Sequence, residues 1–516
     1  MSSNEFDVCV IGSAFGGGPA ALRAAEAGAS VVVLEQGKRW DGRGDSHEFR
    51  QVQGDFGYYM DLFDLYAGVN PTTLAASVVI GGKGLGGGSL VYSMVSLRAP
   101  SFVFDDPAWP GAVDRAALDP FYERAEAQLG ITQVQWTGNR PDDDWKLASR
   151  RDAMFAEVCR ASAMSCDPVP VAVNESCENL GWCTTGCTKG AKTSVDVRYM
   201  QPAEDLGAEM RLGTKVASIQ PADPGGQRRW KVTTLDMTSG DPTVVLADDV
   251  FVGAGAVGSA ALLQASAHLL PGGISAQTGL NLSRGGDMMI PLVVPEDFGF
   301  DDMDMMPGKI IGSASFEHLF TPPPGMGDDW APFIIEPMMI LPVISSLIVA
   351  DPDGQIGEGD MRTFGLGQKH LMQKWGTRLI HLGIMGVDGM DGRVSADRNG
   401  KVDVHFDLSP QTRKLFSSGK AAADHMAASI GGQRLPSWDE IRNDGLTIHP
   451  QGTCRMADSA DIGVVDDRCR VFRSDGGVHE GLHVVDASTY SSPIAVNTSL
   501  TAAAISERAM SIWSAG

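Results

Sequence analysis

Short apolar runs that end in small-residue turns recur along the chain. The run Phe6–Ile11 leads into a turn at Gly12, an Ala-rich stretch from Pro19 to Gly28 and a second apolar run at Ser30–Leu34. Short apolar runs bounded by glycine are typical of buried strands, and the Ala-rich stretch between them is typical of a helix. A strand, a small-residue turn and a helix start follow again over Asp248–Ala265. These patterns predict an α/β fold with a doubly wound sheet.

The first turn has the residues of a dinucleotide-binding turn. Gly12 and Gly17 lie in it, and Glu35 directly follows the second strand. This arrangement places a pyrophosphate at a helix N-terminus and a ribose hydroxyl on the carboxylate. Ala14 stands where a second glycine is usual, although Gly16–Gly18 keep the turn permissive. A tight turn in another kind of α/β unit is the competing interpretation.

A second glycine cluster occupies Gly81–Ser89 and precedes an apolar stretch. Glycine stabilises neither helices nor strands, so such a segment suits a backbone surface that lies against a flat ligand, with a flexible surface loop as the alternative. The turn at Gly253–Ser259 is the third of this kind. Three such turns predict one extended ligand across the sheet, whereas a nicotinamide enzyme normally needs only the first.

Composition and charge narrow the function classes. The chain has 516 residues, 43% of them apolar, so two or more packed units are expected. Its net charge of −23 disfavours nucleic acid and anionic membrane surfaces as partners, and no apolar run is long enough to span a bilayer. Because the first predicted strand begins almost at the N-terminus, we expect no signal peptide. Eight cysteines are too few for a disulfide scaffold, so we expect a cytoplasmic protein.

The C-terminal part of the chain contains four further motif blocks, at His449–Met456, Gly463–Asp466, Gly481–Ser488 and Asn497–Arg508. Together with the N-terminal pattern and Gly81–Ser89, these blocks resemble the glucose–methanol–choline family of flavin oxidoreductases. Two further segments, Cys183–Ser194 and Glu35–Trp40, are similar to the branch of bacterial cholesterol oxidases and long-chain alcohol oxidases.

This resemblance implies a discontinuous Rossmann-type FAD-binding domain and a substrate domain built on an antiparallel β-sheet roofed by helices, so that the fold is α+β overall. We place the first part of the FAD-binding domain, with its cap and Cys-rich insertions, at residues 1–290. The substrate domain follows at 291–430, and the second part of the FAD-binding domain, with the catalytic residues, at 431–516.

The resemblance also implies the cofactor contacts. No histidine occurs between residues 78 and 100, where some relatives attach FAD covalently, so we expect non-covalent FAD. A helix over 500–512 would direct its positive end at the flavin. The implied residues are Gly12, Ala14, Gly17 and Glu35 for the ADP half, Val216 near the adenine, Gly86, Gly87, Gly88 and Ser89 along the ribityl chain and ring, and Asp486, Asn497, Thr498 and Ser499 closing the site.

Alcohol oxidation needs a group that removes the hydroxyl proton. The family's motif places His449 beside the flavin, and an imidazole with an ordinary pKa of about 6.5 suits this task. Asn497 occupies the partner position; we assign it to holding the substrate oxygen, with a loop or helix cap as the alternative.

Glu336 is the third candidate. It lies in an apolar segment, where desolvation raises the pKa of a carboxyl group and lets it move protons. Its placement is similar to that of the acidic residue over the substrate in cholesterol oxidases. An ion-paired structural role is the alternative.

Four cysteines, Cys166, Cys177, Cys183 and Cys187, lie close together in the sequence. They lack the C-x2-C pairs that favour a metal centre, so we predict buried cysteines and no metal, with an iron–sulfur cluster or zinc as the alternative.

The substrate is predicted to be a sterol or another bulky or long-chain alcohol. Methionines suit a roomy apolar pocket but also an ordinary core, which we favour. These residues are Met288, Met289, Met303, Met305, Met306, Met338 and Met339.

Other interpretations of the substrate, the electron acceptor and the class of function stay open. A sugar or glycoside remains an alternative substrate, although Trp330 and Trp375 are the only tryptophans in the middle region. Oxygen or an unidentified carrier would accept the electrons. A flavin-fold lyase or decarboxylase without net oxidation is the alternative of another class. A non-catalytic electron carrier would not need His449 together with Asn497.

Overall fold

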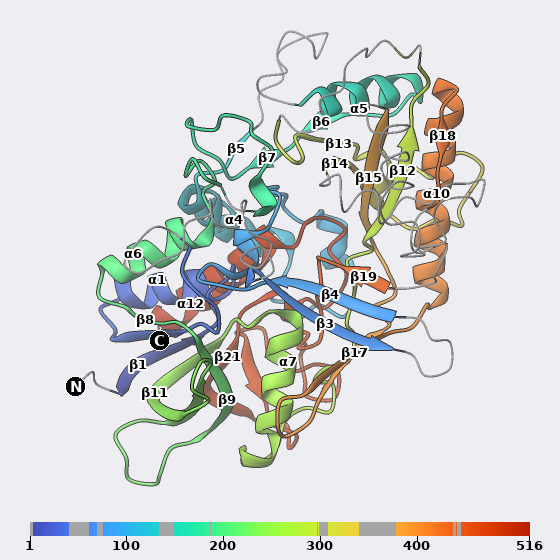
Figure 1. The fold of residues 1–516 in the computed structure, drawn as a ribbon. Helices are drawn as coiled ribbons and strands as arrows, with labels where there is room; N and C mark the ends of the chain where they lie inside the picture. The colour runs from blue at the N-terminus through green and yellow to red at the C-terminus, as the bar shows by residue number, and fades with distance from the viewer. Residues whose placement is uncertain are drawn as a thin grey trace.

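The computed structural model describes residues 4–40, 61–69, 76–133, 149–185, 187–296, 298, 308–339, 378–436, 440 and 445–515. Its largest sheet has eight strands, with the order β20-β21-β11-β1-β2-β8 and with β9 and β10 attached through β11. Both chain ends lie beside this sheet (Figure 1). The strands are β1 (Glu5–Ile11), β2 (Val31–Leu34), β8 (Glu209–Arg211), β9 (Thr214–Pro221), β10 (Trp230–Asp236), β11 (Pro242–Val252), β20 (Arg470–Phe472) and β21 (Val478–Val484).

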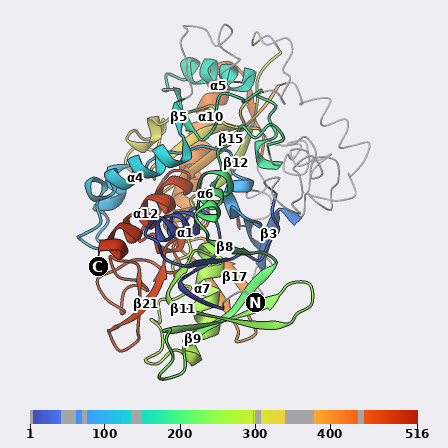
Figure 2. The ribbon, with the colours of Figure 1, turned by 90° about the vertical axis from the view of Figure 1, so that its left-hand side faces the viewer.

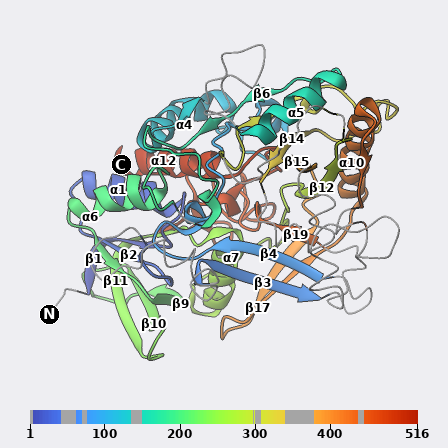
Figure 3. The same ribbon diagram turned by 45° about the horizontal axis from the view of Figure 1, so that its top comes forward.

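The predicted βαβ unit forms the centre of this sheet. β1 pairs in parallel with β2 and with β11, and α1 (Gly17–Glu26) connects β1 to β2. The helix begins two residues before Pro19 and ends two residues before Gly28. α1 and α12 (Ser499–Ala515) pack on one side of the sheet, and α7 (Gly255–Ser266) lies on the other (Figure 3). The doubly wound α/β prediction is confirmed.

A second, antiparallel sheet lies apart from the first, as predicted. Its order is β14 (Phe333–Met338), β15 (Leu379–Gly386), β12 (Met288–Val293) and β18 (Gln433–Arg434). Two helices, α5 (Arg150–Ala161) and α10 (Pro410–Ile430), pack against it (Figure 2). The sheet extends slightly beyond residues 291–430 at both ends, and its assignment to substrate binding stays a prediction.

A third, smaller sheet has three strands. β3 (Phe63–Val69) and β4 (Ala76–Gly82) form an antiparallel pair, and β19 (Gly445–Thr447) joins β4 in parallel. β16 (Gly392–Ala396) and β17 (Val402–Phe406) form a hairpin beside them. The remaining elements are α4 (Arg115–Leu129), α6 (Gln201–Asp205), β5 (Thr132–Gln133), β6 (Asp167–Pro168), β7 (Pro170–Val171), β13 (Ser313–Ala314) and the single turns η1 (Gly87–Leu90), η2 (Ser101–Asp105), η3 (Cys183–Thr185), η4 (Asp196–Met200), η5 (Ala267–Leu269), η6 (Glu317–Leu319) and η8 (Ala487–Thr489).

Two hydrophobic cores correspond to the two large sheets. One surrounds β1, β2, β11 and their helices, and the other joins the antiparallel sheet to α5 and α10. In the part of the chain that is described, every helix is too short or too polar to cross a bilayer.

A buried carboxylate on α12 ties the helices of the main sheet together. The Glu507 side chain has no exposed surface and accepts hydrogen bonds from Arg23 Nε and Nη2, each at 2.8 Å. Arg124 lies 3.1 Å from the same carboxylate, and the Tyr199 hydroxyl donates to it at 3.1 Å. Because the charge is paired several times over, its burial is tolerated.

We predict that Glu507→Gln destabilises the protein by about 3–5 kcal/mol, because it leaves the Arg23 guanidinium buried without its main counter-charge. Thermal unfolding would show a midpoint several degrees lower. Glu26→Gln removes the half-exposed partner of the same Arg23 and should cost below about 1 kcal/mol. Equal effects of the two changes would contradict the prediction.

Candidate active site

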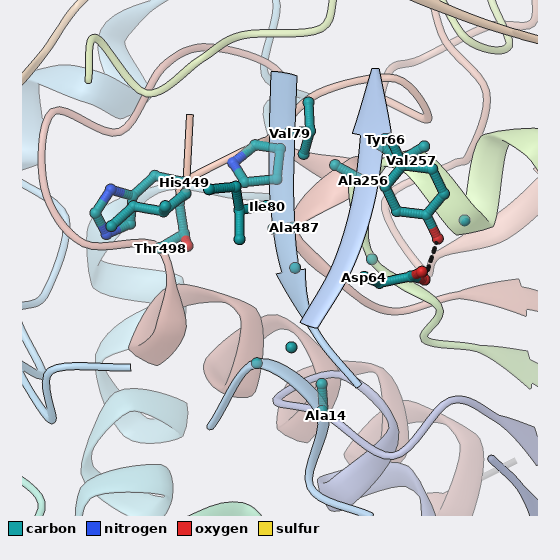
Figure 4. A pocket seen from close by; sticks show the side chains of 18 of the residues that line it. Ala14, Asp64, Tyr66, Val79, Ile80, Ala256, Val257, His449, Ala487 and Thr498 are labelled. Carbon is teal, nitrogen blue, oxygen red and sulfur yellow. Dashed lines mark hydrogen bonds between the residues drawn. The ribbon is translucent and has the colours of Figure 1, made fainter. Parts of the chain in front are cut away.

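A cavity of about 1360 Å³ extends from the ends of the main parallel strands to the antiparallel sheet. It exceeds the roughly 300–1,000 Å³ of ordinary ligand sites, so it has room for a dinucleotide and a substrate together. Figure 4 shows His449 and Thr498 at one end and Ala14, Tyr66 and Ala256 elsewhere along its wall. The predicted residues that line it are Gly12, Ala14, Glu35, Gly87, Gly88, Val216, Glu336, His449, Asp486, Asn497, Thr498 and Ser499.

The glycines of the first turn allow two main-chain segments to touch. Gly12 has φ +85°, and a methyl group added there would lie 2.5 Å from the Gly253 carbonyl oxygen. One added at Gly17 would lie 1.9 Å from the Gly12 oxygen. The ends of β1 and β11 therefore meet through backbone alone. Gly17 lies behind the cavity wall and permits this turn.

The second glycine segment, Gly81–Ser89, packs directly on the first turn, which begins at Gly12. A methyl group added at Gly87 would lie 2.6 Å from the Ala14 methyl group, so Ala14 contacts the Gly87 turn. Gly88 faces open cavity, since nothing lies within 4 Å of an added methyl group. Gly86 and Ser89 lie outside the lining; the Ser89 hydroxyl donates to Gly86 O and accepts from Val195 N.

Glu35 and Ser13 connect the first two turns. The Ser13 hydroxyl donates to Glu35 Oε2 at 2.6 Å and accepts from Gly86 N at 3.0 Å, while Gly37 N donates to Glu35 Oε1. Burial raises the pKa of Glu35, although these hydrogen bonds oppose the rise. Sequence reasoning identified Glu35 but missed Ser13, whose partners lie far apart in the sequence.

Asp486 holds the third turn. Its Oδ2 accepts from Gly255 N at 2.8 Å and from the Ser259 hydroxyl at 2.5 Å, and its Oδ1 accepts from Ser488 N. The carboxylate therefore joins the start of α7 to the turn after β21, at the cavity wall.

The cavity wall fits an FAD molecule. The three turns present main chain rather than side chains, and Ala14, Phe15 and Gly16, which lead into the N-terminus of α1, line the wall where a diphosphate would lie near the positive end of that helix. Glu35 lies at the end of β2, where a ribose would reach it, and Val216 lines the wall from β9.

At the other end of the cavity, His449, Asn497 and Glu336 come together. Asn497 Nδ2 donates to Glu336 Oε2 at 3.5 Å, a long hydrogen bond. Glu336 is fully buried, and within the described part of the chain Glu336 Oε1 and Asn497 Oδ1 have no hydrogen-bond partner. Buried polar atoms are normally satisfied, so these two are placed to receive a polar group of a ligand.

His449 is held by a carboxylate that the sequence did not reveal. Asp287 directly precedes β12, and its Oδ1 atom lies 2.7 Å from Nδ1 of His449. The two residues are 162 positions apart, and Asp287 belongs to none of the motifs; the Gly285–Gly286 pair before it is the only local sign of a tight turn.

The electrostatics of the three groups differ. Burial raises the pKa of Glu336 to about 8, so the carboxyl group is mainly neutral at pH 7. Burial opposes the charged form of His449, but the attraction and hydrogen bond of Asp287 outweigh it, and the pKa of His449 lies above its ordinary value. The site therefore combines a neutral acid with an imidazole stabilised in its charged form.

The Cys-rich loop supports the second glycine segment. Lys192 Nζ donates to Cys183 O at 2.8 Å and to Leu90 O at 2.7 Å, and burial lowers the pKa of this lysine to about 8. Burial also raises the pKa of Cys183 to about 11. Among the described residues, no three His, Cys, Asp or Glu side chains are arranged to hold a metal.

The predicted apolar residues fall partly in the cavity wall. Met288, Met289, Met338 and Met339 line it, and Met288 and Met339 are also buried in the cores, so the two interpretations of these methionines overlap. Met303, Met305, Met306 and Trp375 lie outside the described residues, and Trp330 does not line the cavity.

Comparisons with known proteins identify the family of the chain. Models of the GMC oxidoreductase family match residues 61–282 and 390–506. The chain is 26% identical to a cholesterol oxidase of Mycobacterium tuberculosis, covering 99% of this chain and 91% of that protein. It is 22% identical to a long-chain-alcohol oxidase of Arabidopsis thaliana, covering 96% and 65%.

A solved structure with the same fold is pyridoxine 4-oxidase from Mesorbium loti, with a TM-score of 0.66, 15% identity and 99% coverage of both chains. The chain belongs to the GMC oxidoreductase family, whose members are FAD-dependent, and it is an oxidoreductase acting on CH–OH donors.

Proposed function

We propose that the protein oxidises the CH–OH group of a bulky, largely apolar alcohol to a carbonyl group, with His449 as the general base. The observation that carries this proposal is the meeting of His449, Asn497 and Glu336 at one end of a cavity whose other end is built from the three glycine turns. Two unpaired buried polar atoms, Glu336 Oε1 and Asn497 Oδ1, face this end.

FAD, bound along the three turns, would supply the group that accepts the hydride from the alcohol carbon. Its contacts would come from Gly12, Ala14, Glu35, Gly88 and the segment 497–499, with Gly17, Gly86 and Ser89 shaping the turns from behind. Non-covalent binding is part of the proposal, because the segment 78–100 contains no histidine.

Three side chains, His449, Asn497 and Glu336, act on the hydroxyl group of the substrate. His449 Nε2 takes the hydroxyl proton, since Nδ1 is occupied by Asp287. Asn497 holds the substrate oxygen through the second N–H of Nδ2, whose other N–H points to Glu336, and stabilises negative charge as it develops. Glu336, neutral below about pH 8, donates a hydrogen bond to the same oxygen without adding a charge that would repel it.

The substrate proposal follows from the lining. Apolar side chains from β12, β14 and β15 surround the three polar groups, among them Met288, Met338 and Ile384. A single reacting hydroxyl with an apolar body matches this distribution better than a sugar, which needs many polar partners. Relatives named cholesterol oxidase and long-chain-alcohol oxidase support a sterol or long-chain alcohol, and their names as oxidases support oxygen as the electron acceptor.

We expect His449→Ala to retain FAD and to reduce the rate of alcohol-dependent flavin bleaching about 10²-fold or more, because proton removal loses its base. An anaerobic stopped-flow experiment with a panel of long-chain alcohols and sterols measures this, and wild-type protein admitted to air afterwards tests oxygen as acceptor. Full activity in the variant would overturn the assignment. Absence of bleaching in the wild type with every alcohol would overturn the proposed reaction.

Gly87→Ala should weaken FAD binding at least about tenfold, because the added methyl group meets Ala14 and the backbone there is left-handed, with φ +52°. The ratio of flavin to protein absorbance after dialysis measures retention. Gly81→Ala is the matched control, since its methyl group meets only Asp64 O at 3.8 Å. Equal retention in both variants would argue against a cofactor along this turn.

The pH dependence tests Glu336. Above about pH 8 the carboxylate forms and repels developing negative charge, so flavin reduction in the wild type should fall as pH rises through this value. In Glu336→Gln the side chain stays neutral, and this alkaline decrease should disappear. Persistence of the decrease in the variant would remove Glu336 from the reaction.

A further inference from the structure

The turn before β12 is shaped to bring a carboxylate against His449. Gly285 and Gly286 have φ of +66° and +70°, a conformation that favours glycine. A methyl group added at Gly285 would lie 2.9 Å from both the Cβ and the carbonyl oxygen of His449. The turn therefore touches His449 through its main chain, and Asp287 follows at its end.

Both oxygens of Asp287 are used on the His449 segment. Oδ1 contacts His449 Nδ1 at 2.7 Å, while Oδ2 accepts from Ile448 N at 2.8 Å and from His449 N at 3.0 Å. The Thr447 hydroxyl also lies 2.8 Å from Oδ2. The Asp287 side chain is only 12% exposed. A surface ion pair would not have this set of partners, so the carboxylate sets both the position of the backbone and the direction of the ring.

We propose that Asp287 is the positioning residue of the reaction: it accepts a hydrogen bond from the Nδ1–H group of His449, directs Nε2 to the substrate hydroxyl, and stabilises the imidazolium that forms. The inference rests on the proposed function. In the step itself the O–H bond of the alcohol breaks, its proton forms a bond to Nε2, and the electron pair stays on the alcohol oxygen. Asp287 keeps its hydrogen bond to Nδ1 throughout and takes no proton in the step.

The sign of the pH effect follows from the charges that face His449. Asp287 acts from the turn before β12 and Glu336 from β14, and both favour the charged imidazole when ionised. Arg284, on the same turn, has its guanidinium over the rings of Phe406, at 4.5 Å, and Phe416. Loss of the Asp287 charge lowers the pKa of His449, so the neutral base is reached at a lower pH.

We expect Asp287→Asn to lower the limiting rate of anaerobic flavin reduction about 10²-fold and to move the acidic limb of its pH profile toward lower pH. The same shift should occur when both proteins also contain Glu336→Gln, which removes the second titrating group. Asp287→Glu, which keeps the charge, should restore the position of the limb in part.

Asp388→Asn is the matched control. Asp388 accepts from the Ser283 hydroxyl at 2.7 Å and from Arg284 N at 2.8 Å, so it holds the same turn without touching His449. The Asp388→Asn variant should have lower thermal stability, while the midpoint of the acidic limb of its pH profile for flavin reduction should stay unchanged. An unshifted limb in Asp287→Asn, or an equal shift in Asp388→Asn, would overturn the proposal.

A second measurement needs no substrate. In protein with ¹⁵N-labelled histidine, the His449 signals, identified by their absence from His449→Ala, should show a proton on Nδ1 in the wild type. They should titrate at a lower pH in Asp287→Asn. If no alcohol bleaches the wild type, the proposed reaction fails, whereas an unchanged His449 titration in Asp287→Asn refutes the role of Asp287 alone.

Discussion

The backbone contact between Gly12 and Gly253 is the constraint on which the rest of the site depends. It brings the ends of two parallel strands so close that no side chain fits between them. The cavity wall at this point consists of main chain, and the turn 13–16 that follows leads into the positive N-terminal end of α1, which favours an anion. A β-carbon at either position would separate the strands and change every contact built above them.

Hydrogen bonds from side chains then fix the other turns to this contact. Ser13 joins the first turn to Glu35 and to the second glycine segment, and Asp486 joins the third turn to the strand end at β21. Each link connects segments that lie far apart in the chain. The three glycine turns are therefore tied together, because moving any of them would break a hydrogen bond to a buried side chain.

The end of the cavity that contains His449, Asn497 and Glu336 buries several ionisable groups. An isolated buried charge would destabilise the protein, and the structure avoids one in two ways. Glu336 is mainly neutral at pH 7. The Asp287 carboxylate pairs with the imidazole of His449, with Oδ1 2.7 Å from Nδ1. Alcohol oxidation moves a proton toward His449, so the surroundings favour the state that the reaction produces. The apolar side chains around the three groups keep water from weakening these interactions.

The sequence by itself determined the features that depend on local spacing. Strand, turn and helix follow one another within a few residues, so the βαβ unit, the three glycine turns and the family were readable, as were His449 and Asn497 within their motifs. Glu336 was readable as a desolvated acid but not as a neighbour of Asn497. Tertiary structure alone decided the partnership of Asp287 with His449, the link through Ser13, and the placement of Gly17, Gly86 and Ser89 behind the wall. These depend on how segments that are 22 to 162 positions apart pack together, and such contacts leave no periodic signal in the sequence.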